Sequence, residues 1–226
     1  MENLQATMDR ATMCEFYPAG NVVRRAIAVL RHQGLKSFWF KILGELGYRR
    51  LLLLERSLAQ PVSEVIAGLP IRVDVLQETD VDDYLVFRPD TPLTSVTERL
   101  TLGHRCYLAR HEGRIVAACW TATRSVWSEY LGCEIGLGAG DAYLFDRFTL
   151  PAFRGLRIGN AVRMRQLRNL QQAGYRRTIS AIMLENKPAL RDIAKGGAKP
   201  FAVIGRFKFG RWQRTFRRRW TGELAD

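Results

Sequence analysis

A single turn between an apolar run and a long amphipathic run constrains this fold more than any other part of the sequence. Its residues, Leu150–Val162, read LPAFRGLRIGNAV. Pro151 ends a strand because it cannot donate to a strand ladder, and Gly155 and Gly159 let the backbone approach a ligand closely. The helix that follows begins with unpaired N–H groups and the positive end of its dipole. The turn predicts a strand–turn–helix unit that binds an anion, although a merely basic turn is an equally good interpretation of these residues alone.

Strand-like and helix-like patterns alternate after residue 70. Apolar and polar residues alternate over 71–77 as in a half-buried strand, and HEGR at 111–114 separates two β-rich runs as in a hairpin. Further strands are expected at 48–58, 142–150, 176–184 and 200–212, and helices at 78–87, 95–102, 158–174 and 186–195. We therefore predict an α+β domain (mixed α/β) in which an antiparallel hairpin region leads into a β–turn–α–β unit.

Two basic amphipathic helices are expected before the first strand, at 21–34 and 36–46. Such a pair can cover the core of its own domain or lie on a membrane surface, and the first use is the commoner one. We predict that residues 1–68 form a helical N-terminal extension with a short strand, and that residues 69–226 form the main domain.

The net charge of +13 over 226 residues points to anionic partners. A positive field attracts nucleic acid, anionic lipid and a polyphosphate cofactor alike, so charge alone does not choose between them. No run approaches the roughly 20 apolar residues of a membrane span, and the N-terminus lacks the apolar block of a signal peptide, so we expect a cytoplasmic protein. The four cysteines lack CxxC spacing and the three histidines form no ligand pattern, which predicts neither a disulfide nor a metal site.

The turn and the elements after it resemble the GNAT superfamily of acyl-CoA-dependent N-acetyltransferases. The resemblance runs from about residue 71 to 209, and the close motif match from about 143 to 198. That match comprises a strand ending before proline, then Arg-Gly-x-x-Ile-Gly, a long helix, a strand and ENKPAL. The resemblance implies the acyl-CoA N-acyltransferase fold, a central twisted mixed sheet flanked by helices. It also implies acetyl-CoA or another acyl-CoA as cosubstrate, and no metal.

The resemblance carries over to individual positions of the turn. Backbone amides of the family loop wrap the pyrophosphate of coenzyme A, and the matching residues are Arg154, Gly155, Leu156, Arg157, Ile158, Gly159 and Asn160. The strand before the loop parts from its neighbour, so that the pantetheine arm is expected to bond to the backbone of Phe148, Thr149 and Leu150. Asn186 and Ala189 match the family's Asn-x-x-Ala segment, and Asn186 joins the expected cofactor-binding residues.

Two positions depart from the family pattern. Arg157 stands where the loop normally has its middle glycine, and its side chain is long enough to reach a phosphate directly. Ile193 stands where a tyrosine often protonates the departing thiolate. A thiol has a pKa of about 8 to 9, so its thiolate leaves at neutral pH with little acid help, and water or another donor can serve.

Amide formation from a thioester needs an acceptor for the amine proton and donors for the oxyanion, but no nucleophilic side chain. Asp146 is the first candidate base because it interrupts an apolar strand just before the turn, and a structural partner for an arginine is an equally good interpretation. Glu134 and Asp141 are second candidates in a loop expected to line the amine pocket, with exposed loop carboxylates as the commoner alternative. A thiol relay through Cys106 or Cys119 is disfavoured because no histidine is near in sequence.

The function predicted from these residues is transfer of an acetyl or longer acyl group from coenzyme A to an amine of a small molecule or peptide, by direct attack in a ternary complex. One alternative donor is acyl carrier protein or a long-chain acyl-CoA, as in N-acyl amino acid synthases. Another alternative is a non-catalytic protein that binds nucleic acid or another anion on the same scaffold. Peripheral membrane contact through the N-terminal helices, the acceptor and the oligomeric state stay open.

The C-terminal stretch RFKFGRWQRTFRRRW, residues 206–220, interleaves arginine with aromatic residues, as single-strand nucleic-acid binders do. A terminal β-strand followed by a basic, partly solvated end is the commoner interpretation, so nucleic acid is not an expected partner.

Overall fold

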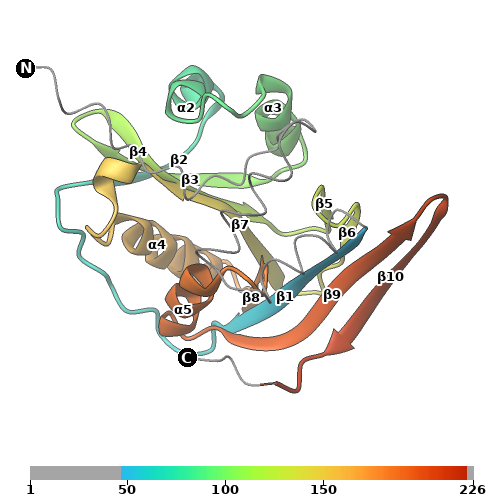
Figure 1. Cartoon of the computed structure of the whole chain (residues 1–226). Helices are drawn as coiled ribbons and strands as arrows, with labels where there is room; N and C mark the ends of the chain where they lie inside the picture. The colour runs from blue at the N-terminus through green and yellow to red at the C-terminus, as the bar shows by residue number, and fades with distance from the viewer. Residues whose placement is uncertain (1–46, 223–226) are drawn as a thin grey trace, which may run out of the picture. The chain divides into compact units, whose positions relative to one another are not determined.

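A computed structural model of the chain describes residues 47–222. Within them, eight strands form one sheet in the order β10-β9-β1-β8-β7-β4-β3-β2 (Figure 1). Their bounds are β1 Tyr48–Ser57, β2 Arg72–Val75, β3 Arg105–His111, β4 Arg114–Ala122, β7 Asp141–Thr149, β8 Arg177–Ile182, β9 Lys199–Phe209 and β10 Trp212–Arg219. Neighbouring strands pair antiparallel except β7 and β8, which run parallel. The helices expected at 21–34 and 36–46 lie outside the described residues.

Helices cover both faces of this sheet (Figure 1). Helices α2 (Val81–Phe87) and α3 (Leu93–Thr101) lie on one face, and α4 (Ile158–Gln172) and α5 (Lys187–Lys195) lie on the other. The predicted α+β fold, a mixed sheet flanked by helices, is confirmed. Within residues 47–222, no helix is both long and apolar enough to cross a membrane.

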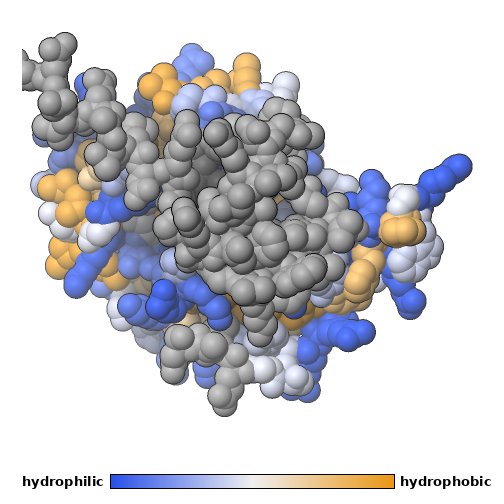
Figure 2. Space-filling model, in the orientation of Figure 1, coloured by the Kyte–Doolittle hydropathy of each residue, from blue (hydrophilic) through white to orange (hydrophobic). Residues whose placement is uncertain are grey.

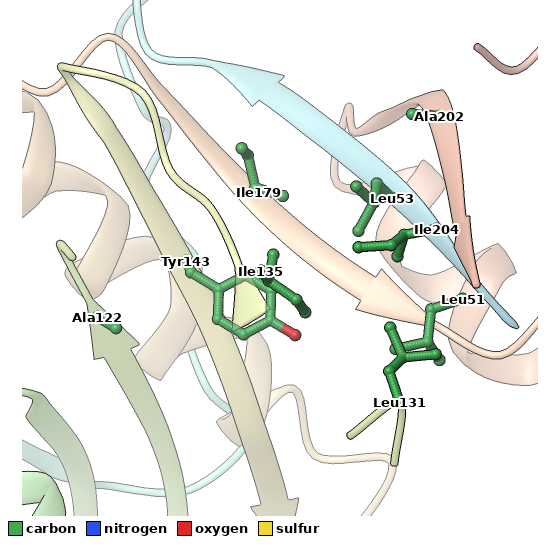
Figure 3. Packing of buried hydrophobic residues seen from close by; sticks show 9 residues of the cluster. All are labelled: Leu51, Leu53, Ala122, Leu131, Ile135, Tyr143, Ile179, Ala202 and Ile204. Carbon is green, nitrogen blue, oxygen red and sulfur yellow. The ribbon is translucent and has the colours of Figure 1, made fainter. Parts of the chain in front are cut away.

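A small second sheet closes the face that α2 and α3 leave uncovered. Strands β5 (Val126–Ser128) and β6 (Cys133–Ile135) pair antiparallel in the loop between β4 and β7. Leu131 and Ile135 from this loop pack against Leu51 and Ile204 of the main sheet, in the cluster drawn in Figure 3. These strands were not predicted, because segments of three residues are too short to show a period.

Strand β1 lies inside the sheet, between β9 and β8. Its four leucines are buried because both of its faces are covered: Leu51 and Leu53 pack toward β5 and β6, whereas Leu52 and Leu54 pack against α5. A continuous apolar run is what a strand buried on both faces requires. Strand β1, which lies within the expected extension 1–68, therefore belongs to the same sheet as the strands of residues 69–226.

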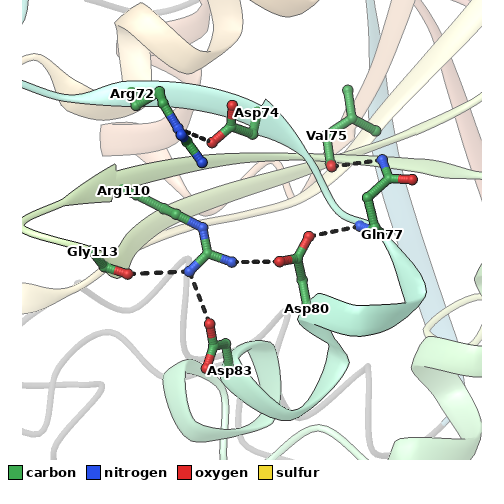
Figure 4. Close-up of polar contacts among 8 residues, drawn as sticks. All are labelled: Arg72, Asp74, Val75, Gln77, Asp80, Asp83, Arg110 and Gly113. Carbon is green, nitrogen blue, oxygen red and sulfur yellow. Dashed lines mark hydrogen bonds and ion pairs between the residues drawn. The ribbon is translucent and has the colours of Figure 1, made fainter.

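An arginine on β3 fixes helix α2 to the sheet (Figure 4). The Arg110 guanidinium donates to Asp80 at 2.8 Å, to Asp83 at 2.9 Å and to the Gly113 carbonyl at 3.2 Å. Asp80 also caps the start of the short 3-10 turn by accepting from the Gln77 N–H. This network sets the position of α2, and with it the position of the residue that follows α2, Arg88.

Strands β9 and β10 form a hairpin at the edge of the sheet, so residues 206–220 contain the expected strand, but their basic end forms a second strand, β10. The pairing register of β9 and β10 places Phe207, Phe209, Trp212 and Phe216 on one face of the hairpin. Phe209 is 83% and Trp212 58% exposed near the tip. In the view of Figure 2 this hairpin shows hydrophobic and hydrophilic residues side by side. The basic residues between the aromatic ones extend into solvent.

Candidate functional site

Strands β7 and β8 pair only over their first residues. The pairs are Asp141 with Arg177, Ala142 with Thr178 and Tyr143 with Ile179. From Leu144 to Thr149 the edge of β7 that faces β8 has no strand partner among the described residues, although its other edge still pairs with β4. The predicted separation of β7 from its neighbouring strand is therefore present, and it leaves backbone donors and acceptors of β7 open to an extended ligand.

The turn after β7 leads into the N-terminus of α4, and Pro151 opens it with a single 3-10 turn. In residues 47–222, the backbone N–H groups from Gly155 to Asn160 form no hydrogen bond with a backbone carbonyl, and the first such bond of the helix is donated by Ala161 to Arg157. A 15-residue helix also directs the positive end of its dipole to this point. Six unpaired amides and a helix dipole together favour a phosphate or another anion.

Arg157 adopts the left-handed conformation, with φ of 57°, at the cap of α4. A non-glycine residue in this region is strained because its Cβ approaches the following carbonyl. The geometry explains why a glycine would suit this position, and it leaves the exposed Arg157 side chain outside the helix. Arg154 is already engaged, since its Nε donates to the Thr149 carbonyl at 3.2 Å.

Gly159 lies where α4 comes close to the end of β7. A Cβ built at this position would lie 3.0 Å from Thr149 Oγ1. A larger side chain here would push the start of the helix away from the strand, because contacts this short are rarely tolerated. The glycine therefore sets how closely the row of amides approaches the open edge of β7.

A β-bulge interrupts β7 close to its C-terminal end. Ala118 pairs with Phe148 and Trp120 pairs with Phe145, so Cys119 alone faces two residues, Asp146 and Arg147. Asp146 has a φ of 46°, in the left-handed region. The extra residue of a bulge redirects side chains. Here the side chain of Asp146 reaches α2 and α3, and that of Arg147 reaches α5 on the opposite face.

Two arginines hold the carboxylate of Asp146. Arg88 Nη1 lies 3.1 Å from Oδ1, and Arg99 Nη1 lies 2.6 Å from Oδ2. The guanidinium of Arg88 also stacks over Phe148, and that of Arg99 over Trp120. Because each carboxylate oxygen already accepts from a guanidinium, these contacts favour the interpretation of Asp146 as an arginine partner over that of a free base.

The other two candidate carboxylates lie away from the bulge. Asp141, only 6% exposed in its side chain, forms a bidentate pair with Arg177 at 2.6 and 2.9 Å and accepts from the Gly138 N–H. The hydrogen bonds from Arg177 hold the pKa of Asp141 below its usual value. Arg177 also binds Glu55, so this cluster clasps β7, β8 and β1 where they meet. Glu134 is exposed on β6. The three predicted carboxylates do not converge.

The residues at α5 that correspond to the family's Asn-x-x-Ala segment and tyrosine have structural roles. Asn186 caps α5, since its side chain accepts from the Ala189 N–H at 3.2 Å. Ile193, at the position of the family tyrosine, is buried against Leu52 and Leu54 of β1. An aliphatic side chain here fills the core beneath β1 and offers no proton.

His104, which was not among the predicted site residues, lies beside the bulge. It is 8% exposed, its ring meets Phe145 edge to face at 5.6 Å, and its Nδ1 is buried without a partner in the described residues. Burial lowers the pKa of His104, and the positive charge of Arg99 lowers it further, so the imidazole is neutral at neutral pH. A lone histidine after a helix carries no sequence pattern by which it could have been found.

The two buried cysteines are not activated as nucleophiles. Burial raises the pKa of Cys106 well above its usual value and that of Cys119 to about 11. The thiolate is the reactive form of cysteine, and a raised pKa suppresses it at neutral pH. This agrees with the expectation that a thiol relay is not used.

Two surface hollows lie outside this region. One is next to the Arg110 network of Figure 4, and the other lies by Asp141, Arg177 and Lys199 at the paired end of β7 and β8. Neither is lined by the amides of α4 or by the open edge of β7. The candidate site therefore consists of a strand edge and a helix end.

Solved structures with the same architecture include a GCN5-related N-acetyltransferase from Sphaerobacter thermophilus, with a TM-score of 0.52 and 15% identity over 81% of this chain. Another is a protein from Novosphingobium aromaticivorans assigned to the GNAT family, with a TM-score of 0.50 and 18% identity over 70% of this chain. The chain spans 56% and 65% of the lengths of these two structures. Comparisons with protein-family models and with curated proteins find no match. The described residues have the GNAT fold.

Proposed function

We propose that this chain, which has the GNAT fold, transfers an acyl group from coenzyme A to an amine of a small molecule or peptide, most simply an acetyl group. The observation that carries the proposal is the row of unpaired amides from Gly155 to Asn160 at the end of a strand that has parted from its neighbour. An acyl-CoA has a pyrophosphate that can bind the row of amides, and an extended amide-containing arm that can bond to the open strand edge. Few other ligands combine an anion with a strand-like segment.

The residues present fit such a donor, which would supply an activated thioester. The amides of residues 155–160 would hold the pyrophosphate, and the exposed Arg157 side chain would reach a phosphate. The open backbone edge of β7 up to Thr149 would bond to the pantetheine arm, as a further strand bonds to a sheet edge, whereas the Leu150 N–H already donates to the Val116 carbonyl of β4. Asn186 would act indirectly, by capping the helix that borders the opening.

In the transfer, the amine nitrogen bonds to the acyl carbon, the carbon–sulfur bond breaks, and the amine loses a proton. We assign proton acceptance to His104, because a neutral imidazole with an unpartnered nitrogen lies beside the bulge on the α2 and α3 face. Asp146 would hold Arg88 and Arg99 in place rather than accept the proton. Asp141 is held by Arg177 and Glu134 is exposed on β6, so neither is assigned this role.

Calorimetric titration of the full chain with coenzyme A and acetyl-CoA tests the proposal. Gly159→Glu is expected to abolish binding, because it places bulk against Thr149 and a negative charge among the amides. Thr94→Glu, which adds the same charge on the exposed surface of α3, is the matched control and should bind as the wild type does. Absence of binding by the wild type to coenzyme A and acetyl-CoA would refute the proposal.

The β9–β10 hairpin supports a second candidate function, binding of single-stranded nucleic acid. Residues 199–219 contain no acidic side chain, and exposed aromatic rings share one face with arginines. Aromatic faces stack on bases and arginines attract phosphates. Titration with a fluorescent oligonucleotide at increasing salt separates this candidate from the first, since phosphate contacts weaken steeply as salt rises.

A further inference from the structure

Helix α4 contains a buried arginine that has no partner. Arg163 is 4% exposed, and no side chain or carbonyl within residues 47–222 forms a hydrogen bond or an ion pair with it. Burial, together with the positive charges of Arg147 and Arg56, lowers its pKa to about 10. Arg163 still carries its charge at neutral pH. Burying a charge without a counterion is costly, so this residue calls for a negative group.

The neighbours of Arg163 supply too little negative charge. Arg147 is paired with Asp192 of α5 at 2.5 Å, and Arg56 of β1 donates to the carbonyl of Gly196. The cluster therefore holds three guanidinium groups and a single carboxylate. The end of α5 does not make up the difference: Arg163 Nη1 lies 2.9 Å from where a Cβ of Gly196 would stand, but within residues 47–222 the Gly196 carbonyl accepts from Arg56 and not from Arg163.

The cluster lies beside the bulge, on the face of α4 and α5. The guanidinium groups of Arg147 and Arg163 both act on the thiol of Cys119, where their charges oppose the larger effect of burial on its pKa. Cys119 is the residue that faces the bulge. Arg163 is five residues beyond Ile158, which at about 1.5 Å per residue places it about 7.5 Å from the start of the helix. Its guanidinium lies at the end of α5, with Nη1 2.9 Å from the position of a Cβ built at Gly196.

The chemistry of the donor narrows the group that Arg163 can bind. Between its pyrophosphate and its sulfur, the pantetheine arm contains amides and a hydroxyl but no charge. A permanent negative charge beside the bulge must then belong to the acyl group or to the acceptor. We infer that the cluster of Arg163, Arg147 and Arg56 binds a carboxylate at the far end of the acyl chain, so that the preferred donor is a dicarboxylic acyl thioester such as succinyl-CoA. This inference rests on the proposed function.

Calorimetric titration with succinyl-CoA and butyryl-CoA tests the inference, because these acyl groups have four carbons each and only the first has a carboxylate. The wild type is expected to bind succinyl-CoA at least about tenfold more tightly. Arg163→Met should abolish this preference and leave the affinity for acetyl-CoA within about twofold of the wild type. Arg163→Lys should retain part of the preference, since the charge remains but the bidentate hydrogen bonding of the guanidinium is lost.

Two controls keep the result specific. Arg165→Met removes a charge from the exposed face of the same helix and should leave the preference unchanged. Thermal unfolding of Arg163→Met is expected at the same temperature as the wild type or higher, because an apolar side chain replaces an unpaired buried charge. This measurement separates a loss of recognition from a loss of fold.

Each other outcome overturns the inference. Equal affinity of the wild type for butyryl-CoA and succinyl-CoA would do so. An equal loss of affinity for acetyl-CoA and succinyl-CoA in Arg163→Met would indicate a contact with the pantetheine arm instead. An equal loss of turnover with both donors, at unchanged affinity, would indicate stabilisation of the oxyanion. Failure of coenzyme A itself to bind would refute the proposed function, whereas binding of coenzyme A without preference for succinyl-CoA refutes this inference alone.

Discussion

Arg99 Nη1 lies 2.6 Å from Asp146 Oδ2 and ties helix α3 to the bulge of β7. Arg88, which follows α2, holds the other oxygen of the same carboxylate at 3.1 Å. One aspartate therefore fixes both helices on that face of the sheet over the point where β7 changes direction. The arrangement gives Asp146 a structural reason to be present, whichever group accepts the proton.

Asp146→Asn is expected to lower turnover by about 100-fold, because a shift of the helices misplaces the reacting groups. It should change the affinity for coenzyme A much less, since the amides of α4 lie on the other side of the bulge. The loss of two partly buried ion pairs should reduce the free energy of unfolding by about 2 kcal/mol. Steady-state kinetics, calorimetric titration and urea unfolding give the three quantities.

The arginine variants decide between the two roles of Asp146. If the carboxylate positions α2 and α3, Arg99→Gln will reproduce most of the loss in turnover. If Arg99→Gln keeps full turnover while Asp146→Asn has none, Asp146 is the proton acceptor. Arg72→Gln is the control, since it breaks an exposed pair with Asp74 and should cost less than about 0.5 kcal/mol.

Arg157→Gly is expected to stabilise the fold and weaken coenzyme A binding at the same time. Glycine adopts the left-handed conformation of this position without strain, which should raise the free energy of unfolding by about 1 kcal/mol. Removal of an exposed charge beside the amides should weaken binding by about tenfold at low salt and less at high salt. Arg157→Ala is the matched control, because it loses the charge but keeps the strain. Unchanged affinity in both variants would show that the side chain does not contact a phosphate.

The strand–turn–helix unit could be predicted because its determinants are local. Pro151 ends β7, and Gly155 and Gly159 mark the turn, so that neighbouring residues alone fix the row of amides. The same is true of the hairpin at Glu112 and Gly113, whose positive φ angles of 49° and 80° suit a tight turn between β3 and β4.

The environment of the candidate carboxylates could not be predicted in this way. The partners of Asp146 are 58 and 47 residues away in sequence, and Arg177 is 36 residues from Asp141. A charged residue inside an apolar strand indicates a special role, but it does not reveal whether a base or an ion pair occupies the site. His104 owes its burial to the packing of α3 against β7, which no local pattern records.

His104 should make the stability of the fold depend on pH. Burial lowers its pKa below the unfolded value of about 6.5, so the unfolded chain binds the proton more readily than the folded one. The stabilising contribution is complete above about pH 6.5 and is lost as the pH falls below that value toward the lowered folded pKa. Urea unfolding from about pH 7 to 5 is therefore expected to show a steeper loss of stability in the wild type than in His104→Gln. Parallel profiles would contradict a buried, neutral histidine.

Asp141→Asn tests the clasp that holds β7, β8 and β1 together. The buried carboxylate forms two hydrogen bonds with Arg177, and its replacement should reduce the free energy of unfolding by about 2 to 3 kcal/mol at neutral pH. The pKa of Asp141 is lowered in the folded state, so this contribution is present above the unfolded value and is lost as the pH falls through the lowered one. The difference between wild type and variant should therefore shrink under acidic conditions.

Glu64→Gln serves as the control for Asp141→Asn, because Glu64 forms an exposed ion pair with Arg168 and its loss should cost less than about 0.5 kcal/mol. Coenzyme A binding also separates two origins of the effect. The clasp lies at the paired end of β7 and β8, away from the amides of α4, so the folded Asp141→Asn variant should bind coenzyme A as the wild type does. A large loss of affinity in a variant that remains folded would place Asp141 in the ligand site, and the clasp would then have a functional as well as a structural role.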